Sequence, residues 1–294
     1  MIKRIYVKVK NFGLTQLNRG KFFRDIKEIN DKGVVNLLEF SYDKKLFGGD
    51  VALSHKVEGL RKGIIEDSDL IVKTYGSPHS NSPLFDESGK VIPGSFLDHS
   101  IKGVAQTGTN QFGGVQLKRI IDAFGKGHIL ELGTNTGLSG CYFISSENAE
   151  HLYTIEGSSD LCRIAEKNLQ TVGKNFTVFN GLFDDILEKL NKKCYFMYAF
   201  IDGQHEKNAT LHYMEKIIPM MKNGGLIIFD DIYWSEGMND AWKTIQNDNR
   251  FDLVLDFGWR GVVRLSPANT ESGDKFSFDL TRYHGKPNIQ RPGW

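Results

Sequence analysis

The stretch HILELGTNTGLSG, residues 128–140, decides the fold of this 294-residue chain. It opens with an apolar run and continues as a loop with glycines at positions 133, 137 and 140. A buried strand that runs into a glycine-spaced turn is typical of the first βα unit of a nucleotide-binding α/β domain. Glu131 precedes the first glycine, and its carboxylate would repel a phosphate and attract an amino group. The loop therefore favours a ligand that carries an ammonium group.

Further short apolar runs alternate downstream with segments of helical period, the pattern of a mostly parallel sheet covered by helices. In residues 158–173, serines can cap a crossover helix and Gly173 can end it. The last two runs are separated only by Gly258, Trp259 and Arg260, which predicts a terminal antiparallel hairpin. We expect a doubly wound, seven-stranded sheet with strands at 128–133, 151–157, 176–181, 195–202, 226–231, 251–257 and 261–266.

The chain divides into three predicted parts. Residues 1–103 form an accessory region on the acceptor side, 104–266 the cofactor-binding domain, and 267–294 a tail that wraps the surface. Within the first part, 3–12 has the pattern of a strand and 54–64 that of a short helix. The span 75–95 is rich in Ser, Pro and Gly, which is typical of a lid, a binding loop or a disordered segment.

Composition excludes some partners. Lys and Arg total 37 against 36 for Asp and Glu, so there is no basic excess to attract nucleic acid or an anionic membrane. We find no apolar run of the roughly 18–20 residues that a membrane span needs and no apolar core of a secretory signal. We therefore expect a cytoplasmic protein. The three cysteines, Cys141, Cys162 and Cys194, lack metal-type spacing and are interpreted as core thiols.

A second acid follows the next strand. Glu156 ends HLYTIEG, about 20 residues after the first loop, where a doubly wound sheet places an acid against ribose hydroxyls. A ribose together with an ammonium group indicates S-adenosylmethionine. With ELGTxxG and TIEG, the chain resembles the class I S-adenosylmethionine-dependent methyltransferases over about residues 104–265, which implies a Rossmann-like methyltransferase fold. The cofactor-binding residues expected from the pattern and the resemblance are Glu131, Gly133, Thr134, Gly137, Glu156, Phe183, Asp184 and Asp202, with Phe183 and Asp184 beside the adenine.

The chemistry is expected where the fourth and fifth strands end. Asp202 and His205 follow the fourth strand, and Asp230 and Asp231 end the fifth. Strand ends of a parallel sheet meet in one crevice, and a few aspartates there suit Mg²⁺. The layout resembles the metal-dependent small-molecule O-methyltransferases, which implies Asp202, Asp230 and Asp231 as metal ligands.

Two positions depart from that family. It has Asp-Asn where this chain has Asp230-Asp231, and a lysine base where this chain has His205. The Asp-Gly-x-His and FDDIxWS runs are closer to a broad bacterial group of class I methyltransferases. The sequence therefore leaves a requirement for magnesium open.

We expect transfer of a methyl group to a hydroxyl of a small molecule or glycan, with His205 and Asp202 as catalytic residues and His205 as the base. The alternatives are an N-methyltransferase for a small amine, a module that binds the cofactor without turnover, and a metal-dependent hydrolase. The sequence leaves the oligomeric state open, a homo-oligomer included.

Overall fold

The computed structural model describes residues 2–66, 69–75, 96–190, 192–193, 195–267 and 275–289. The Ser-, Pro- and Gly-rich span lies outside the described residues from position 76 to 95, and so does Cys194. Cys141 and Cys162 are buried and free, which confirms the interpretation of these two as core thiols.

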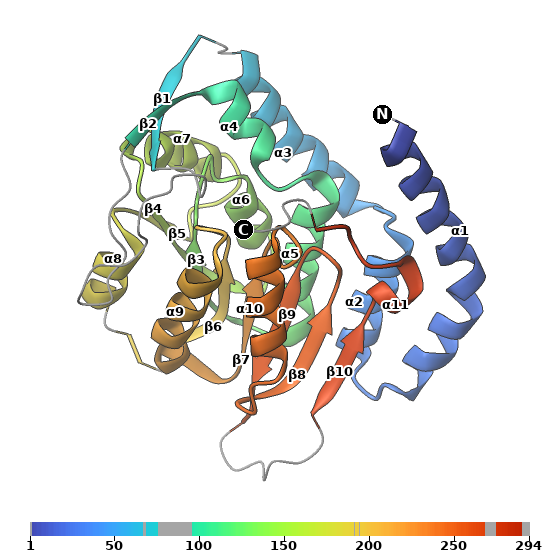
Figure 1. Cartoon of the computed structure of the whole chain (residues 1–294). Coiled ribbons are helices and arrows are strands. Elements are labelled where there is room, and N and C mark those ends of the chain that lie inside the picture. The colour runs from blue at the N-terminus through green and yellow to red at the C-terminus, as the bar shows by residue number, and fades with distance from the viewer. Residues whose placement is uncertain are drawn as a thin grey trace.

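The centre of the molecule is an eight-stranded sheet with the order β10-β8-β9-β7-β6-β3-β4-β5 (Figure 1). Only β9 runs antiparallel, to β7 on one side and β8 on the other. The doubly wound sheet and its antiparallel hairpin are confirmed, but the sheet has eight strands instead of the seven expected, because β10 adds one beside β8. The strands are β3 Gly127–Leu132, β4 Ala149–Glu156, β5 Phe176–Asn180, β6 Phe196–Ile201, β7 Met221–Phe229, β8 Phe251–Asp256, β9 Gly261–Leu265 and β10 Phe276–Asp279.

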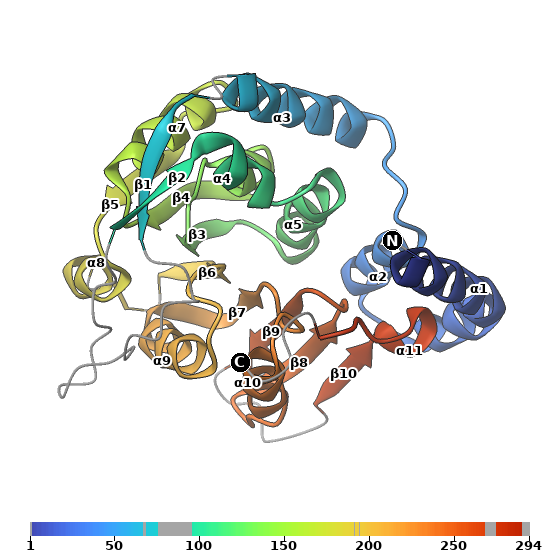
Figure 2. The same cartoon turned by 45° about the horizontal axis from the view of Figure 1, so that its top comes forward.

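The two faces of the sheet carry different helices (Figure 2). One face packs against α5 Gln111–Phe124, α6 Leu138–Ile144 and α7 Ser159–Gln170. The other packs against α8 Phe183–Leu190, α9 Lys207–Ile217 and α10 Glu236–Gln246. Side chains of Ser158, Glu206 and Ser235 cap α7, α9 and α10 by accepting hydrogen bonds from backbone N–H groups. These caps fix the point at which each chain segment leaves the edge of the sheet.

The N-terminal region is mainly helical, and the strand predicted at 3–12 is wrong. Those residues belong to a 24-residue helix whose later part buries Phe22 completely, so the longer segment overrides a short alternating pattern. The helix expected at 54–64 is confirmed within α3. The elements are α1 Ile2–Asp25, η1 Ile26–Glu28, α2 Lys32–Asp43, α3 Gly49–Glu66, β1 Ile71–Tyr75, β2 Phe96–Ser100 and α4 Ile101–Thr107. None of the described helices is both long and apolar enough to span a membrane.

The end of the described chain differs from the expected surface tail. Strand β10 extends the sheet beside β8, and α11 Thr281–His284 follows it. Phe278 and Tyr283 are buried there and stack at a centroid distance of 5.7 Å. Phe22 of α1 stacks on Tyr42 of α2 at 4.0 Å and meets Tyr283 edge-on at 5.4 Å. An aromatic cluster of Phe22, Tyr42, Phe278 and Tyr283 thus joins the N-terminal helices to the last strand.

A buried carboxylate organises the loop after β3. Glu131 has no solvent exposure, and its two oxygens accept hydrogen bonds from the hydroxyls of Ser139 at 2.5 Å and Thr154 at 2.6 Å. These bonds tie β3 to α6 and β4. Burial raises the pKa of Glu131 to about 7, although both hydrogen bonds oppose the shift.

Gly133 allows two strand ends to approach closely. A Cβ atom at this position would lie 2.2 Å from the carbonyl oxygen of Asp202, and its φ of +101° favours glycine. The Asp202 N–H donates to the Leu132 carbonyl at 3.0 Å across the same junction. The first loop and the end of β6 are therefore in direct backbone contact.

We predict that Gly133→Ala destabilises the protein more than Gly125→Ala does. Gly125 has a similar φ of +96° but open space around it, so its substitution costs only backbone strain, about 1–3 kcal/mol. At Gly133 the clash adds about 1–3 kcal/mol. Urea unfolding of both variants measures the difference, and equal losses would contradict the close approach.

We predict that Glu131→Gln removes a pH dependence of stability. Because the folded-state pKa is about 7 against an ordinary 4.5, the native state retains a proton that the unfolded state has lost. Wild-type stability should therefore fall as pH rises from about 5 to 8, by roughly 3 kcal/mol. The glutamine variant should lose this contribution of Glu131 and show a smaller fall, whereas the exposed Glu150→Gln control should keep the full fall. Unfolding free energies measured at several pH values test this, and an unchanged slope in Glu131→Gln would refute it.

Candidate active site

Glu156 ends β4 beside the first loop. Its Oε2 accepts the Asn135 N–H and its Oε1 the Ser158 N–H, each at 2.9 Å. Burial raises its pKa, against the effect of these backbone hydrogen bonds. A carboxylate has about four acceptor positions, so Glu156 retains acceptor capacity beyond these backbone partners. This acceptor capacity fits a pair of vicinal hydroxyls, as a ribose would present.

The other residues expected around the first loop lie beneath it. Thr134 is almost fully buried, and its hydroxyl shares a hydrogen bond with Thr154 at 2.5 Å. Gly137 has a φ of +80°, and a Cβ there would lie 3.0 Å from Ala165 of α7. Together with Glu131 and Gly133, these residues hold the loop in place. The side chains of Glu131 and Thr134 are buried, and the two glycines allow neighbouring segments to pack closely.

Phe183 and Asp184, both expected beside the adenine, have different surroundings at the start of α8. Phe183 is half-buried and lies over Gly203, where a Cβ would be 2.7 Å from its ring. Asp184 is buried instead, and it pairs with Lys216 at 2.7 Å and with His212 at 2.9 Å. Asp184 thus connects α8 to α9, while Phe183 stays at the edge that holds Asp202.

The residues predicted for the chemistry come together at that edge. His205 lies between two carboxylates, with Nε2 3.8 Å from Asp202 Oδ1 and Nδ1 3.7 Å from Asp231 Oδ2. The His205 ring centroid is 6.2 Å from that of Trp234. Neither His205 nor Asp231 caps a helix, because Glu206 and Ser235 take those positions. Asp231 has a φ of +54°, a strained conformation of the kind found at functional sites.

The three aspartates differ in their surroundings. Desolvation is the main cause of the strongly raised pKa of Asp202, and the charges of Asp230 and Asp231 add to it. Desolvation also raises the pKa of Asp231, while His205 opposes that shift. Asp202 remains accessible, with 26% of its side chain exposed. The crevice therefore brings a partly exposed carboxyl with a raised pKa next to an imidazole.

Asp230 forms an ion pair that was not predicted from the sequence. Arg260, in the turn between β8 and β9, donates from Nη2 to Asp230 Oδ2 at 2.7 Å. β8 runs parallel to β7 in the sheet, so this turn reaches the same edge as Asp230. The sequence indication of this ion pair was the presence of a charged residue in the short turn of the predicted hairpin.

The described residues do not fit the expected magnesium site. They contain no group of three or more His, Cys, Asp or Glu side chains placed to hold a metal ion. Mg²⁺ needs near-octahedral oxygen ligands, whereas one Asp230 oxygen is bonded to a guanidinium. The expectation that Asp202, Asp230 and Asp231 bind a metal is therefore not met by this geometry.

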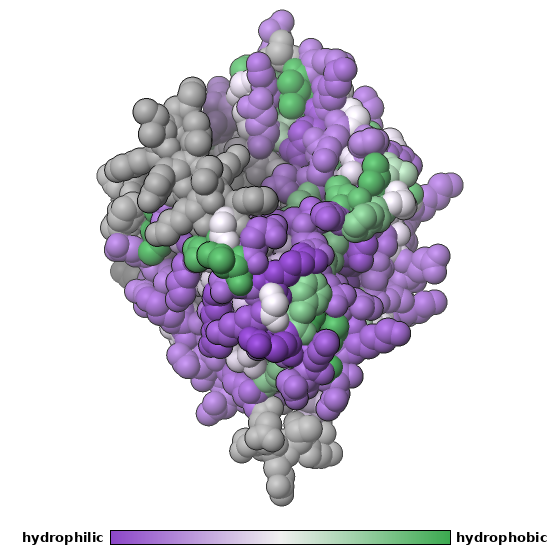
Figure 3. All heavy atoms as spheres, turned by 90° about the vertical axis from the view of Figure 1, so that its right-hand side faces the viewer, coloured by the Kyte–Doolittle hydropathy of each residue, from purple (hydrophilic) through white to green (hydrophobic). Residues whose placement is uncertain are grey.

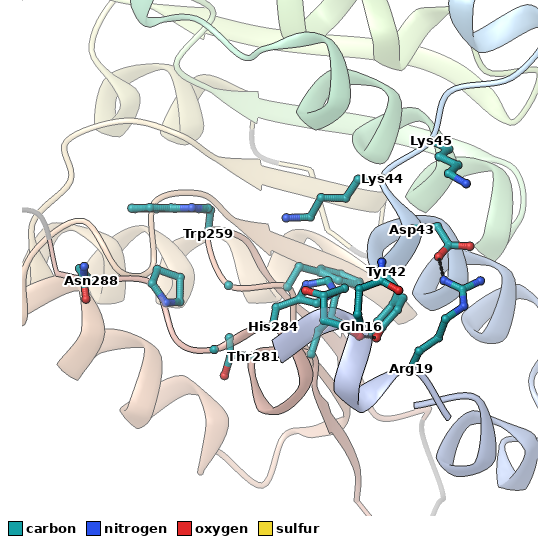
Figure 4. A pocket seen from close by; sticks show the side chains of 16 residues that line it. Gln16, Arg19, Tyr42, Asp43, Lys44, Lys45, Trp259, Thr281, His284 and Asn288 are labelled. Atoms are coloured by element: carbon teal, nitrogen blue, oxygen red, sulfur yellow. Dashed lines mark hydrogen bonds and ion pairs between the residues drawn. The ribbon is translucent and has the colours of Figure 1, made fainter. Parts of the chain in front are cut away.

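A cavity of about 780 Å³ lies where the N-terminal helices meet the turn after β8 (Figure 4). Its wall comes from α1, the end of α2, α11 and the turn after β8. Lys44 extends across it toward Trp259, whose side chain is 40% exposed. The Trp259 carbonyl accepts the Ile232 N–H at 3.1 Å, which connects the cavity wall to the segment directly after Asp231.

A smaller hollow of about 380 Å³ lies on the other side of Phe112 and is lined in part by Gln106 and Gly108. A Cβ at Gly108 would lie 3.7 Å from Leu138, the first residue of α6. On the face of the molecule in Figure 3, hydrophilic residues predominate and apolar residues form small separate patches. The two hollows are therefore the stronger candidates for binding small molecules.

Comparison with known proteins bears on the central part of the chain. Residues 130–232 match a family model described as a methyltransferase domain. The comparison with curated proteins gives no match. Among solved structures, a Corynebacterium glutamicum protein is 13% identical, with 81% of this chain and 100% of that chain covered and a TM-score of 0.52.

Two of the other similar structures are O-methyltransferases with bound ligands. The Bacillus cereus enzyme in complex with S-adenosylhomocysteine is 22% identical, covering 55% of this chain and 83% of its own, with a TM-score of 0.46. The Streptomyces achromogenes enzyme of tomaymycin synthesis, in complex with S-adenosylmethionine, is 16% identical, covering 54% and 82%, with a TM-score of 0.46. The family match over residues 130–232 supports a methyltransferase domain, and these residues lie in the doubly wound sheet described above.

Proposed function

We propose that this protein is an S-adenosylmethionine-dependent methyltransferase that methylates a hydroxyl group of a small molecule or glycan. The observation that carries the proposal is the position of His205 between Asp202 and Asp231, at the strand edge that also bears Glu156. When bound, the cofactor supplies an electrophilic methyl group. The protein's own task is then to orient the two reactants and remove the hydroxyl proton.

Glu156 is the proposed ribose ligand. Its backbone partners, Asn135 and Ser158, fix the carboxylate while leaving acceptor capacity. Glu131, Gly133, Thr134 and Gly137 act indirectly, because they hold the loop that the methionine portion would meet. Phe183, next to Gly203, is the proposed apolar contact for the adenine.

His205 is the proposed base. One ring nitrogen faces Asp202 and the other faces Asp231, so whichever nitrogen takes the acceptor proton, a carboxylate is near the other. A carboxylate beside an imidazole orients the ring and stabilises the imidazolium that forms. Asp202 and Asp231 therefore support proton removal from their positions at the ends of β6 and β7.

The acceptor is proposed to enter from the side of the large cavity. Lys44 and Lys45 bring positive charge to its wall, and Trp259 offers an aromatic face. Sugars and aromatic rings stack on such a face, and an anionic substituent would be attracted by the lysines. This proposal gives the N-terminal region a role on the acceptor side.

An N-methyltransferase for a small amine remains the second candidate, because the same imidazole would accept a proton from an ammonium group. Mass spectrometry of the methylated product separates the two reactions: methylation of a hydroxyl supports the proposal, and methylation only of amines overturns it.

We predict that Glu156→Ala weakens binding of S-adenosylhomocysteine by about tenfold to a hundredfold, because charge-assisted hydrogen bonds contribute roughly 1.5–3 kcal/mol. Calorimetric titration measures this. Glu150→Gln, a substitution of an exposed acid on the same strand, is the matched control and should bind normally. Absence of measurable binding by the folded wild-type protein would refute the assignment of the cofactor.

We predict that His205→Gln lowers kcat by about 10²–10⁴-fold while leaving the affinity for S-adenosylhomocysteine unchanged. The assay follows transfer of labelled methyl groups to a panel of hydroxylated sugars and phenols. His212→Gln, a change on the adjacent helix α9, serves as the control and should retain activity. Full activity of His205→Gln on an acceptor that the wild type methylates would exclude His205 as the base.

A further inference from the structure

The carboxylates of the crevice already have a cation, and it comes from the chain itself. Arg260 reaches Asp230 from the turn after β8, and its side chain is only 6% exposed. A buried carboxylate paired with a buried guanidinium in this way satisfies both charges. The pair lies directly beside Asp231, whose N–H donates to the other Asp230 oxygen at 3.1 Å.

Arg260 is held in place from outside the crevice. Its Nη1 donates to the Gly113 carbonyl at 2.9 Å and to Gln116 Oε1 at 3.2 Å, both on α5. Gln116 in turn donates to the hydroxyl of Ser41 on α2 at 2.9 Å. The guanidinium carbon also lies 5.5 Å from the centroid of the Phe200 ring. The position of the positive charge is therefore set by two helices and a strand.

The charge of Arg260 acts on more than its direct partner. It lowers the pKa of Asp202 and of Asp231, in opposition to the desolvation that raises both. One fixed cation thus offsets part of the repulsion among all three carboxylates. A divalent ion shared by these aspartates would have that electrostatic effect.

We propose that the Arg260 guanidinium takes the place of a divalent metal at this site, so that the protein arranges its acceptor without bound magnesium. Arg260 is then a positioning residue that acts through Asp230. The inference rests on the proposed methyl transfer for its chemical meaning, but the presence or absence of a metal site can be measured without turnover. A dication at Asp230 would face the repulsion of a guanidinium bonded to the same carboxylate.

The test is a titration of Mn²⁺ into chelator-treated protein, followed by electron paramagnetic resonance of the free ion. We expect no stoichiometric Mn²⁺ site in the wild type. Arg260→Met, which removes the charge, should bind one Mn²⁺ at least on the order of a hundredfold more tightly than the wild type. Arg264→Met is the matched control, since Arg264 pairs with Asp252 at 2.9 Å on the same hairpin. It should bind no better than the wild type.

Two results would overturn the inference. One is a stoichiometric Mn²⁺ site in the wild type that Asp230→Asn abolishes. The other is no gain of Mn²⁺ binding in a folded Arg260→Met variant, checked by circular dichroism. If Arg260→Met does not fold, Arg260→Gln replaces it, since it also removes the charge but can still form hydrogen bonds, and it should bind Mn²⁺ more tightly than the wild type. Binding of S-adenosylhomocysteine, measured on the same samples, tests the proposed function separately.

Discussion

The candidate site depends on the contact between the ends of β3 and β6. At this contact Gly133 meets the backbone of Asp202, and no side chain fits between the two strands. The first loop and the end of β6 are therefore held rigidly together. Glu131 also anchors the loop from inside the protein through its hydrogen bonds with Ser139 and Thr154. Because this junction consists of backbone contacts and a buried carboxylate, the side chains of the candidate site have defined positions relative to one another.

Charge is distributed unevenly around the candidate site. Three aspartates and an imidazole occupy the crevice, whereas lysines lie at the large cavity. Arg260 stands between the two regions, bonded to Asp230 and to α5. A near-neutral chain can therefore hold a cluster of carboxylates in one place and lysines at a cavity in another, which the net charge of +1 does not reveal.

Much of the central domain could be predicted because each strand there is a short apolar run between turn signals. The order of strand ends also indicated that Asp202, His205 and Asp231 would meet, and they do. The pairing of Arg260 with Asp230 was missed although the hairpin was predicted, because it depends on which strand the hairpin lies beside, and the sequence does not show this. The start of α1 and strand β10 were missed for a related reason: their structure is set by contacts far away in the sequence, such as that of Phe22 with Tyr283. The direction of Asp184, toward Lys216, is equally a matter of tertiary packing.

The aromatic cluster that joins α1 and α2 to β10 has a consequence for the order in which the protein is assembled. The wall of the large cavity combines residues 15–45 with residues 257–288, which are separated by more than two hundred positions of chain. Contacts at such separation are costly to close and form after local ones. During synthesis the central sheet can be built while the helices of the N-terminal region still lack their partner. The cavity is completed only after β10 and α11 have left the ribosome, so it is the last part of the molecule to acquire its shape.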